Sequence, residues 1–334
     1  MEDEGGLVLN MNKVALKVQD LRTHFFGRTS INKAVDGISY EVWTGEIMAI
    51  VGESGCGKTV GALSLIQLNP PGSQIVRGQV LWKGRDLLRM SKDEITHIRG
   101  KEISMVFQEP LTALNPIQTI GQQIAEVFQI HEGSDKREAE RKTIEMLEAV
   151  AMPDAEKRAK AYPFQLSGGM RQRGMIAMAL SCRPALLIAD EPTTAVDVTI
   201  QAQLLELIAS LAKEIKTTVI LITHNLGIVA RYASKIVIMY AGKIVEKGET
   251  AELYAHPRHP YTISLLKAVP RLDQESKKKL VTIDGQPPPL DHRIPSGCSF
   301  HPRCIHARDK CKEEIPAFRH ILDNHEVACW LVEG

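Results

Sequence analysis

Short uninterrupted apolar runs alternate along this chain with segments in which apolar residues recur every three or four positions. The apolar runs predict strands at 47–51, 103–107, 185–190, 218–223 and 236–240. A run without polar residues suits a strand that is buried on both faces of a parallel sheet. The segment 199–215 has the spacing of a helix with one buried face. Together these patterns predict an α/β fold.

Two other regions have different patterns. Short alternating segments between Val14 and Tyr40 predict antiparallel strands, and 78–84 predicts a further strand and turn. Residues 119–161 have helical periodicity, which predicts an all-helical insertion.

The composition of the chain changes after the predicted hairpin at 236–248, where proline-rich and basic stretches begin. We therefore expect a first domain at 1–250 and a C-terminal extension at 251–334. A helical subdomain is expected at about 110–165.

Length, composition and charge are those of an ordinary globular protein. The chain has 334 residues, 44% of them hydrophobic and 24% charged, and a formal net charge of +1. Nucleic-acid binding usually needs a basic face, so no such partner is expected. No signal segment follows the acidic N-terminus, and no run reaches the roughly 18 apolar residues of a membrane span. We expect a cytoplasmic protein whose six cysteines are thiols or metal ligands.

The glycine-rich stretch 52–59 lies between an apolar strand and a segment with helical spacing. A G-x-x-x-x-G-K-[ST] match in that setting predicts a phosphate cradle. Its three glycines allow backbone conformations in which successive N–H groups point at a polyanion. Lys58 is placed for the β- and γ-phosphates and Thr59 for Mg²⁺. A glycine-rich turn that binds nothing is the alternative.

Acidic and polar side chains follow three of the predicted strands. In α/β proteins, ligands bind at the carboxyl ends of such strands. Asp190 is placed to hold the Mg²⁺ shell, and Glu191 to polarise an attacking water. Gln108 either ligates a metal, orients water or is a loop residue. His224 either bonds a γ-phosphate oxygen or is structural.

Two weaker signals concern anion and base binding. Ser167 is a suitable helix cap, and the two glycines after it leave first-turn N–H groups open to an anion. A plain capped helix is the alternative. Phe25 and Phe26 lie in a polar turn, where one aromatic ring stacks on a nucleobase or caps a sheet edge. Phe26 is the preferred candidate for stacking.

In this order and spacing, the motifs resemble the nucleotide-binding subunits of ABC transporters, over roughly Val14 to Gly248. The resemblance implies a P-loop NTPase core with an antiparallel β subdomain and a helical insertion. It implies ATP, Mg²⁺, a catalytic base at Glu191 and a switch histidine at His224. Val196 stands where this family often has leucine, and both side chains are apolar.

The same resemblance assigns the remaining contacts. ATP contacts are implied for Phe26, Gly52, Glu53, Ser54, Gly55, Cys56, Gly57, Lys58, Thr59 and Gln108. Mg²⁺ ligands are implied at Thr59, Gln108 and Asp190, a D-loop at Asp197, and a signature motif at Ser167, Gly168 and Gly169 that contacts the ATP of a second subunit.

The stretches 107–116, 256–261, 285–290 and 297–304 look like the ATPase subunits of oligopeptide and dipeptide importers. This resemblance implies a motor for peptide uptake at the cytoplasmic face of the membrane. Its partners would be two permease subunits, a second ATPase subunit, identical or related, and indirectly a substrate-binding protein. Nickel importers are similar, so the transported solute stays open.

Four cysteines gather in the extension, at Cys298, Cys304, Cys311 and Cys329. Their spacing matches neither the C-x₂-C pairs of common zinc sites nor the ferredoxin pattern. Four thiolates satisfy either Zn²⁺ or an iron–sulfur cluster. The family resemblance favours a 4Fe-4S cluster, which makes this a small metal-binding extension. Zinc and no metal are the alternatives, and His292, His301 and His306 are competing ligands.

Two other classes of protein share part of this pattern. A metabolic P-loop kinase has the phosphate loop, but it does not need the motif at 166–170 or His224. A soluble ABC-type ATPase that acts on nucleic acid or ribosomes has the whole core. It more often has tandem cassettes, a long coiled coil or a basic face.

Overall fold

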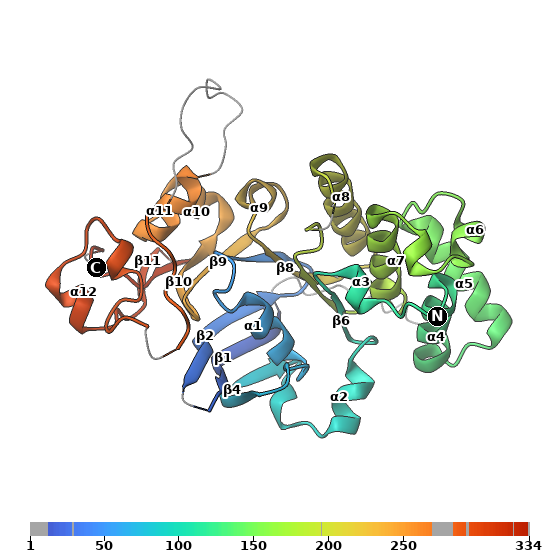
Figure 1. The fold of residues 1–334 in the computed structure, drawn as a ribbon, viewed down its shortest axis with the longest axis horizontal. Helices are drawn as coiled ribbons and strands as arrows, with labels where there is room; N and C mark the ends of the chain where they lie inside the picture. The colour runs from blue at the N-terminus through green and yellow to red at the C-terminus, as the bar shows by residue number, and fades with distance from the viewer. Residues whose placement is uncertain are drawn as a thin grey trace, which may run out of the picture.

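Two sheets form the framework of the protein, and the computed structural model describes residues 13–28, 30–194, 196–268, 283–291, 294–322 and 324–332. The larger sheet has eight strands in the order β11-β12-β10-β9-β3-β8-β7-β6, and the smaller has four in the order β2-β1-β4-β5. The expected α/β core with an antiparallel β subdomain is confirmed (Figure 1).

Five neighbouring strands of the larger sheet are parallel. They are β3 (Ile47–Val51), β6 (Ile103–Val106), β7 (Leu186–Asp190), β8 (Thr218–Thr223) and β9 (Lys235–Tyr240). All four residues of β6, all five of β7 and all six of β8 are buried. Continuous apolar runs therefore form strands covered on both faces, as the sequence predicts.

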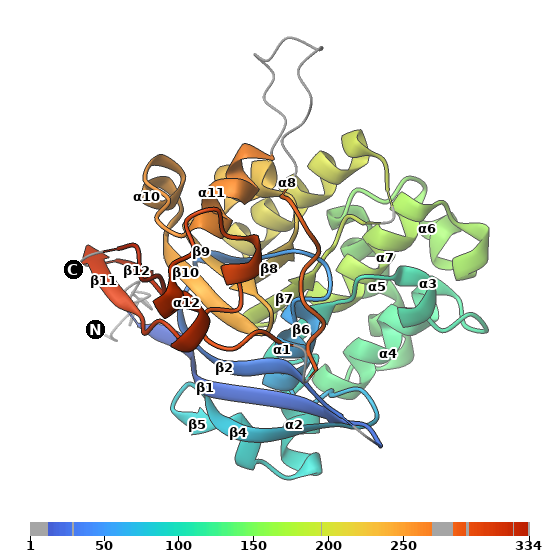
Figure 2. The ribbon, with the colours of Figure 1, turned by 60° about the vertical axis from the view of Figure 1, so that its left-hand side comes forward.

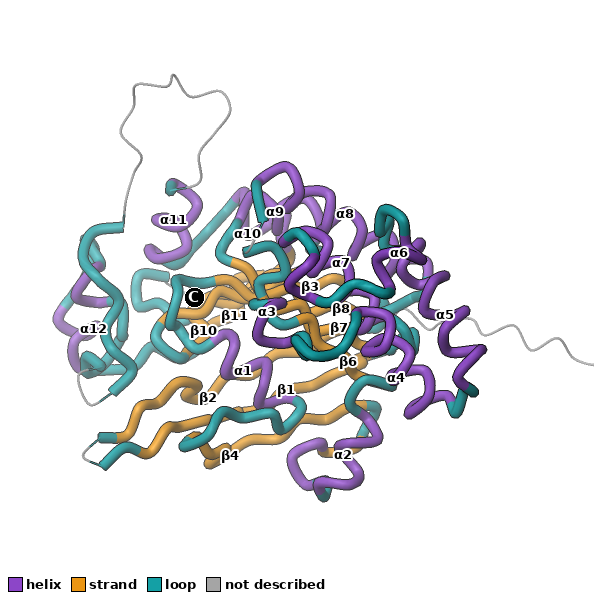
Figure 3. The backbone as a smooth tube through the Cα atoms, turned by 45° about the vertical axis from the view of Figure 1, so that its right-hand side comes forward, coloured by secondary structure: helices purple, strands orange, loops and turns teal. Residues whose placement is uncertain are grey.

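The smaller sheet is antiparallel and packs under the larger one (Figure 3). It contains β1 (Val14–Phe26), β2 (Ile31–Trp43), β4 (Ser73–Trp82) and β5 (Arg85–Asp86). Helix α1 (Lys58–Leu65) shares one hydrophobic core with strands of both sheets. The helix that starts in the phosphate loop is therefore held between the two layers.

Helices cover the other side of the larger sheet and one end of the molecule. Helices α9 (Leu226–Tyr232) and α10 (Thr250–Ala255) pack on the sheet face opposite the smaller sheet (Figure 3). The helical end contains α3 (Pro110–Ala113), α4 (Ile120–Glu132), α5 (Lys136–Ala149) and α6 (Ala155–Ala159). Helices α4 and α5 contact α7 (Gly168–Leu180), which shares a core with α8 (Val198–Glu214). Helix α2 (Lys92–Ile98) follows the smaller sheet.

The C-terminal extension joins the edge of the larger sheet, at the end of the molecule opposite helices α3 to α6 (Figures 1 and 2). Its elements are α11 (Pro260–Lys267), α12 (Asp309–Glu313), β11 (Arg319–Leu322) and β12 (His325–Val327), and β12 pairs with β10 (Lys243–Glu249).

A buried carboxylate contributes to that junction. The Glu246 side chain accepts hydrogen bonds from the backbone N–H groups of Arg258 and His259, and it pairs with His325 Nε2 at 2.8 Å. Among the described residues, no helix combines the length and the apolar character needed to cross a bilayer.

Candidate nucleotide-binding and catalytic site

The phosphate loop is tightly packed against its neighbours. Gly57 has φ +102°, and a Cβ atom added there would lie 1.9 Å from the Ala34 carbonyl oxygen. A Cβ atom at Gly52 would lie 2.3 Å from the carbonyl oxygen of Met239. Neither position accepts a side chain, because backbone atoms occupy the space. The glycines therefore fix the path of the loop against β2 and β9.

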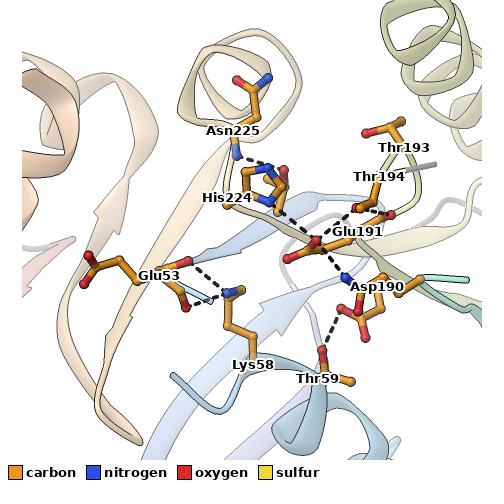
Figure 4. A network of polar contacts seen from close by, with 12 residues as sticks. Glu53, Lys58, Thr59, Asp190, Glu191, Thr193, Thr194, His224 and Asn225 are labelled. Atoms are coloured by element: carbon orange, nitrogen blue, oxygen red, sulfur yellow. Dashed lines mark hydrogen bonds and ion pairs between the residues drawn. The ribbon is translucent and has the colours of Figure 1, made fainter. Parts of the chain in front are cut away.

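Lys58 begins helix α1, and its ammonium group turns back across the loop (Figure 4). Its Nζ donates to the carbonyl oxygens of Gly52, at 2.8 Å, and Glu53, at 3.0 Å. The side chain is 5% exposed. A buried ammonium group at a helix start, beside open N–H groups, is suited to a phosphate ligand.

Asp190, at the end of β7, lies beside Thr59. Thr59 Oγ1 donates to Asp190 Oδ1 at 3.2 Å, and Asp190 is 1% exposed. Burial raises the pKa of Asp190 to about 6, with the negative charge of Glu191 acting in the same direction, while the Thr59 hydrogen bond and Lys58 oppose the rise. A hydroxyl and a buried carboxylate side by side are the donor pair that P-loop proteins use for Mg²⁺.

Three side chains from different elements meet at one oxygen of Glu191. Gln108 Nε2 donates to Oε2 at 3.1 Å. Thr194 Oγ1 donates to the same oxygen at 2.9 Å, and His224 Nδ1 lies 3.4 Å from it (Figure 4). The Glu191 backbone has φ +42°. Left-handed backbone is costly for a residue other than glycine, and such strain is concentrated at functional sites. Gln108, Glu191 and His224, which the sequence analysis proposed separately, are thus brought together.

A cavity of about 390 Å³ lies over the phosphate loop. Its lining residues are Phe25, Asn32, Ala34, Ser54, Gly55, Gly57, Lys58, Thr59, Val60, Gln108, Glu191 and Leu290. The volume falls in the range of small-molecule sites. Phe25 is among these residues and Phe26, its described neighbour, is not. Successive side chains of a strand point to opposite faces, so only one of the two rings faces the cavity.

Thr194 and Leu290 are among the residues at this site that the sequence analysis missed. Thr194 lies three residues after Glu191, close to a motif that was recognised. Leu290 comes from the extension, and its carbonyl oxygen accepts the Lys33 N–H at 2.6 Å. The QPPPL stretch was noted as a family feature, but its pattern gave no indication of a partner at the start of β2.

The structure places the other expected nucleotide contacts outside this cavity. Ser167 caps α7 by accepting the Met170 N–H at 3.3 Å, and Asp197 caps α8 by accepting the Ile200 N–H at 3.0 Å. Among the described residues that line the cavity, none comes from either cap or from Gly168 and Gly169. These motifs thus lie apart from the phosphate loop cavity of their own chain.

The four extension cysteines all carry free thiols in one small region. Burial raises the pKa of Cys298 to about 11, with further contributions from Cys329, Cys311 and Cys304. Within the described ranges, however, no three His, Cys, Asp or Glu side chains converge into a group that could hold a metal ion. The expected metal-binding character of the extension is therefore not supported by this arrangement. His301 Nδ1 lies 3.0 Å from the Cys298 carbonyl oxygen, His306 is exposed, and His292 is outside the described residues.

The fold and the site together define an ATPase of the ABC type. Residues 35–194 match the model of the ABC transporter family. Residues 245–311 match that of the oligopeptide/dipeptide transporter C-terminal region. A dimeric ABC transporter cassette, MJ0796, superposes with a TM-score of 0.64 at 25% identity, covering 70% of this chain and 98% of that one. The same cassette bound to ADP and Pi gives a TM-score of 0.64 at 24% identity over the same shares.

Sequence relatives narrow the class to a family. A probable peptide ABC transporter ATP-binding protein of Sinorhizobium fredii is 48% identical over 94% of both chains. The dipeptide transport ATP-binding protein DppD of Bacillus subtilis is 48% identical over 96% of this chain and 95% of its own. The oligopeptide transport ATP-binding protein OppD of Salmonella typhimurium is 48% identical over 91% of this chain and 90% of its own. The chain belongs to the ATP-binding subunits of oligopeptide and dipeptide ABC transporters, and its activity is ATP hydrolysis coupled to transport.

Proposed function

We propose that this chain drives the uptake of short peptides by binding and hydrolysing Mg-ATP at the phosphate loop cavity. The single observation that carries the hydrolytic part is the convergence of Gln108, Thr194 and His224 on Glu191, next to the Thr59–Asp190 pair. A carboxylate oriented by three side chains is suited to act as a general base towards water.

In this proposal the residues take the following roles. Lys58 and the loop N–H groups of residues 52–59 bind the phosphates, and His224 contacts the γ-phosphate. Thr59, Asp190 and Gln108 would hold Mg²⁺, whose positive charge would neutralise the charge that develops on the phosphates. Glu191 accepts the proton of the attacking water. Phe25, which lines the cavity, would stack on the adenine in place of Phe26, which the sequence analysis preferred.

A second copy or a related subunit would complete the site. Ser167, Gly168, Gly169 and Asp197 would contact the nucleotide held by the partner. The first-turn N–H groups of α7 suit a phosphate. Because these caps lie outside the nucleotide cavity of their own chain, a phosphate held by a second subunit would be their ligand. The ABC transporter cassette MJ0796 is likewise a dimer.

Two permease subunits would receive the motion of this dimer at the cytoplasmic face of a membrane. A groove of about 900 Å³ runs along α4, α5 and α6, with Ile117 at its edge 82% exposed. Ile117, Ala125, Ile144 and Ala159 give this groove an apolar part of its lining, and grooves of this kind receive amphipathic helices of partner proteins. We propose that a cytoplasmic segment of a permease subunit docks here. A substrate-binding protein would then supply the peptide.

The division into a nucleotide-binding domain at 1–250 and an extension at 251–334 remains part of the proposal, as does the helical subdomain at about 110–165. We further propose that the extension binds a metal. Its support is the chemistry of the four free thiols, a donor set that suits a 4Fe-4S cluster or zinc once the side chains are brought together. Cys298, Cys304, Cys311 and Cys329 would hold it, and it would stabilise the fold of the extension. Iron, sulfide and zinc analysis of anaerobically purified protein, wild type and Cys304→Ser, tests it.

Hydrolysis and transport are tested by separate arms of one experiment. Glu191→Gln should lower the turnover of ATP by about 10²–10⁴-fold while Mg-ATP still binds, because only the general base is lost. Unchanged turnover would refute the role of Glu191. Reconstitution with the adjacent permease and binding subunits should give ATP hydrolysis that peptides stimulate. Stimulation by nickel and not by peptides would refute the proposed solute.

A further inference from the structure

Glu53 is the second residue of the phosphate loop, yet its side chain does not face the cavity. The cavity is lined by Ser54, Gly55, Gly57, Lys58 and Thr59, and Glu53 is not among its lining residues. Figure 4 shows the Glu53 carboxylate directed away from Lys58 and Glu191. The contribution of Glu53 to the loop therefore comes from its backbone, whose carbonyl oxygen accepts a hydrogen bond from Lys58.

Arg303 of the extension binds the Glu53 carboxylate with both arms of its guanidinium group. Nη1 donates to Oε2 at 2.6 Å, and Nη2 donates to Oε1 at 3.0 Å. The Arg303 side chain is 5% exposed and that of Glu53 is 24% exposed. A bidentate arginine–carboxylate pair is geometrically specific, and burial from solvent reduces its screening. This contact joins residues that are 250 positions apart in the sequence.

The same guanidinium group also holds the segment that reaches the cavity. Arg303 Nε donates to the Asp284 carbonyl oxygen at 2.9 Å, and Nη2 lies within 3.4 Å of the Ile283 carbonyl oxygen. The chain then runs to Leu290, which lines the cavity beside β2. One side chain thus fixes two walls of the nucleotide site, namely the loop through Glu53 and the segment 283–291.

A cluster of aromatic rings supports this arrangement. Tyr261 Oη accepts the Glu53 N–H at 2.9 Å, so a second group of the extension holds the loop backbone. The rings of Tyr240 and Tyr261 lie 4.7 Å apart, and Phe300 meets Tyr240 edge-on at 5.2 Å. The Arg303 guanidinium lies 5.8 Å from the centre of the Tyr240 ring. Packing on rings restricts the rotamers of Arg303 and lowers the entropy cost of the ion pair.

We propose that Arg303 is a positioning residue for nucleotide binding, through which the C-terminal extension sets the conformation of the phosphate loop and is energetically coupled to the bound nucleotide. This inference rests on the proposed function of the cavity. When Lys58 turns to the phosphates, it releases the Glu53 carbonyl oxygen, and Arg303 and Tyr261 then keep Glu53 in place. The N–H groups of the loop therefore need not reorganise when the phosphates bind, so affinity is gained by preorganisation.

Mg-ADP titration and steady-state hydrolysis with the full-length chain test this coupling. Arg303→Gln should weaken Mg-ADP binding by roughly 10-fold, the equivalent of about 1.4 kcal/mol. The KM for ATP should rise by a similar factor, while kcat changes by less than about threefold, because the groups around Glu191 are untouched. Arg303→Lys keeps the positive charge but cannot donate two parallel hydrogen bonds to the carboxylate. It should therefore bind Mg-ADP more tightly than Arg303→Gln and less tightly than the wild type.

Two further variants separate the ion pair from the folding of the extension. Glu53→Gln should also weaken Mg-ADP binding, by no more than Arg303→Gln, because Arg303→Gln loses the contacts to Asp284 and Ile283 as well. The double variant should bind no more weakly than Arg303→Gln alone, since both changes break the same ion pair. Arg319→Gln is the matched control, because Arg319 contacts Val332 and the Trp330 ring within the extension. It should bind Mg-ADP like the wild type.

The reverse coupling gives a readout that does not depend on activity. Because coupling between two sites is reciprocal, Mg-ADP should slow hydrogen exchange at residues 298–304 in the wild type but not in Arg303→Gln. The inference would be overturned if Arg303→Gln and Glu53→Gln both bound Mg-ADP as tightly as the wild type. It would also be overturned if Arg319→Gln lost as much Mg-ADP affinity as they do. Neither result would affect the proposed function. Should Arg303→Gln fail to fold, Glu53→Gln decides. A wild-type chain without affinity for Mg-ADP would overturn the proposed function itself, and with it this coupling.

Discussion

Replacing Gly57 with alanine should show how strongly the packing of the phosphate loop constrains its sequence. Gly57 has φ +102°, and an added Cβ would lie 1.9 Å from the Ala34 carbonyl oxygen. Ala34 belongs to a part of β2 that backbone hydrogen bonds hold in place, from Lys33 N–H to the Leu290 carbonyl oxygen and from Asp36 N–H to that of Gly242. The clash therefore cannot be relieved by moving one flexible side chain.

Two terms set the magnitude. Left-handed backbone costs alanine about 1–2 kcal/mol relative to glycine. Overpacking against backbone adds about 1–3 kcal/mol. Gly72 isolates the first term, since it has φ +81° and nothing within 4 Å of an added Cβ. We expect Gly57→Ala to lower the free energy of unfolding by about 3–4 kcal/mol and Gly72→Ala by about 1 kcal/mol.

Urea unfolding followed by tryptophan fluorescence measures both variants, because Trp82 is 1% exposed in the native state. Mg-ADP titration should show weaker binding for Gly57→Ala alone, since displacement of the loop moves its N–H groups. Equal losses of stability in the two variants, with unchanged Mg-ADP affinity in Gly57→Ala, would refute the argument that the Ala34 backbone leaves no room for a Cβ.

Two predictions concern pH. Because burial raises the pKa of Asp190 to about 6, protonation should weaken Mg-ATP binding as the pH falls from 7 to 5, and affinity that is constant over this range would contradict the role of Asp190. Burial lowers the pKa of His259 from 6.5 to about 4, so the unfolded chain takes up the proton first on acidification. Stability contributed by neutral His259 is present above pH 6.5 and should be lost towards pH 4, at up to about 1.4 kcal/mol per pH unit. His259→Asn retains an acceptor for the Tyr261 N–H, a bond of 3.1 Å to His259 Nδ1, and should flatten that part of the melting temperature–pH profile. A profile identical to that of the wild type would exclude His259 as the titrating group.

The strands of the parallel sheet were predictable because burial on both faces leaves an uninterrupted apolar run. The run at 185–190 and strand β7 differ by one residue. Strand β4 begins at Ser73, several residues before the predicted 78–84, and its first residues are largely exposed. Ile75 packs against the core, but the neighbouring Val76 is apolar and 44% exposed, so these residues lack the alternation of apolar and polar positions that predicts a strand.

The convergence of Gln108, Asp190, Glu191 and His224 followed from topology. Each lies at or just beyond the carboxyl end of a parallel strand, and adjacent parallel strands end at one edge. The sequence could not decide whether Phe25 or Phe26 lines the cavity, because the two residues are adjacent and identical in type. Only the orientation of β1 against β2 and β4 decided which ring lines the cavity.

The sequence by itself determined the local chemistry of this protein: the phosphate loop, the two carboxylates at the end of β7 and the apolar strands of the sheet. Spacing over a few residues encodes these features, because backbone geometry repeats locally. The tertiary structure alone decided that Arg303 holds Glu53 and that Leu290 lines the cavity. Contacts between residues hundreds of positions apart leave no periodic pattern in the chain, since they depend on how complete elements pack together.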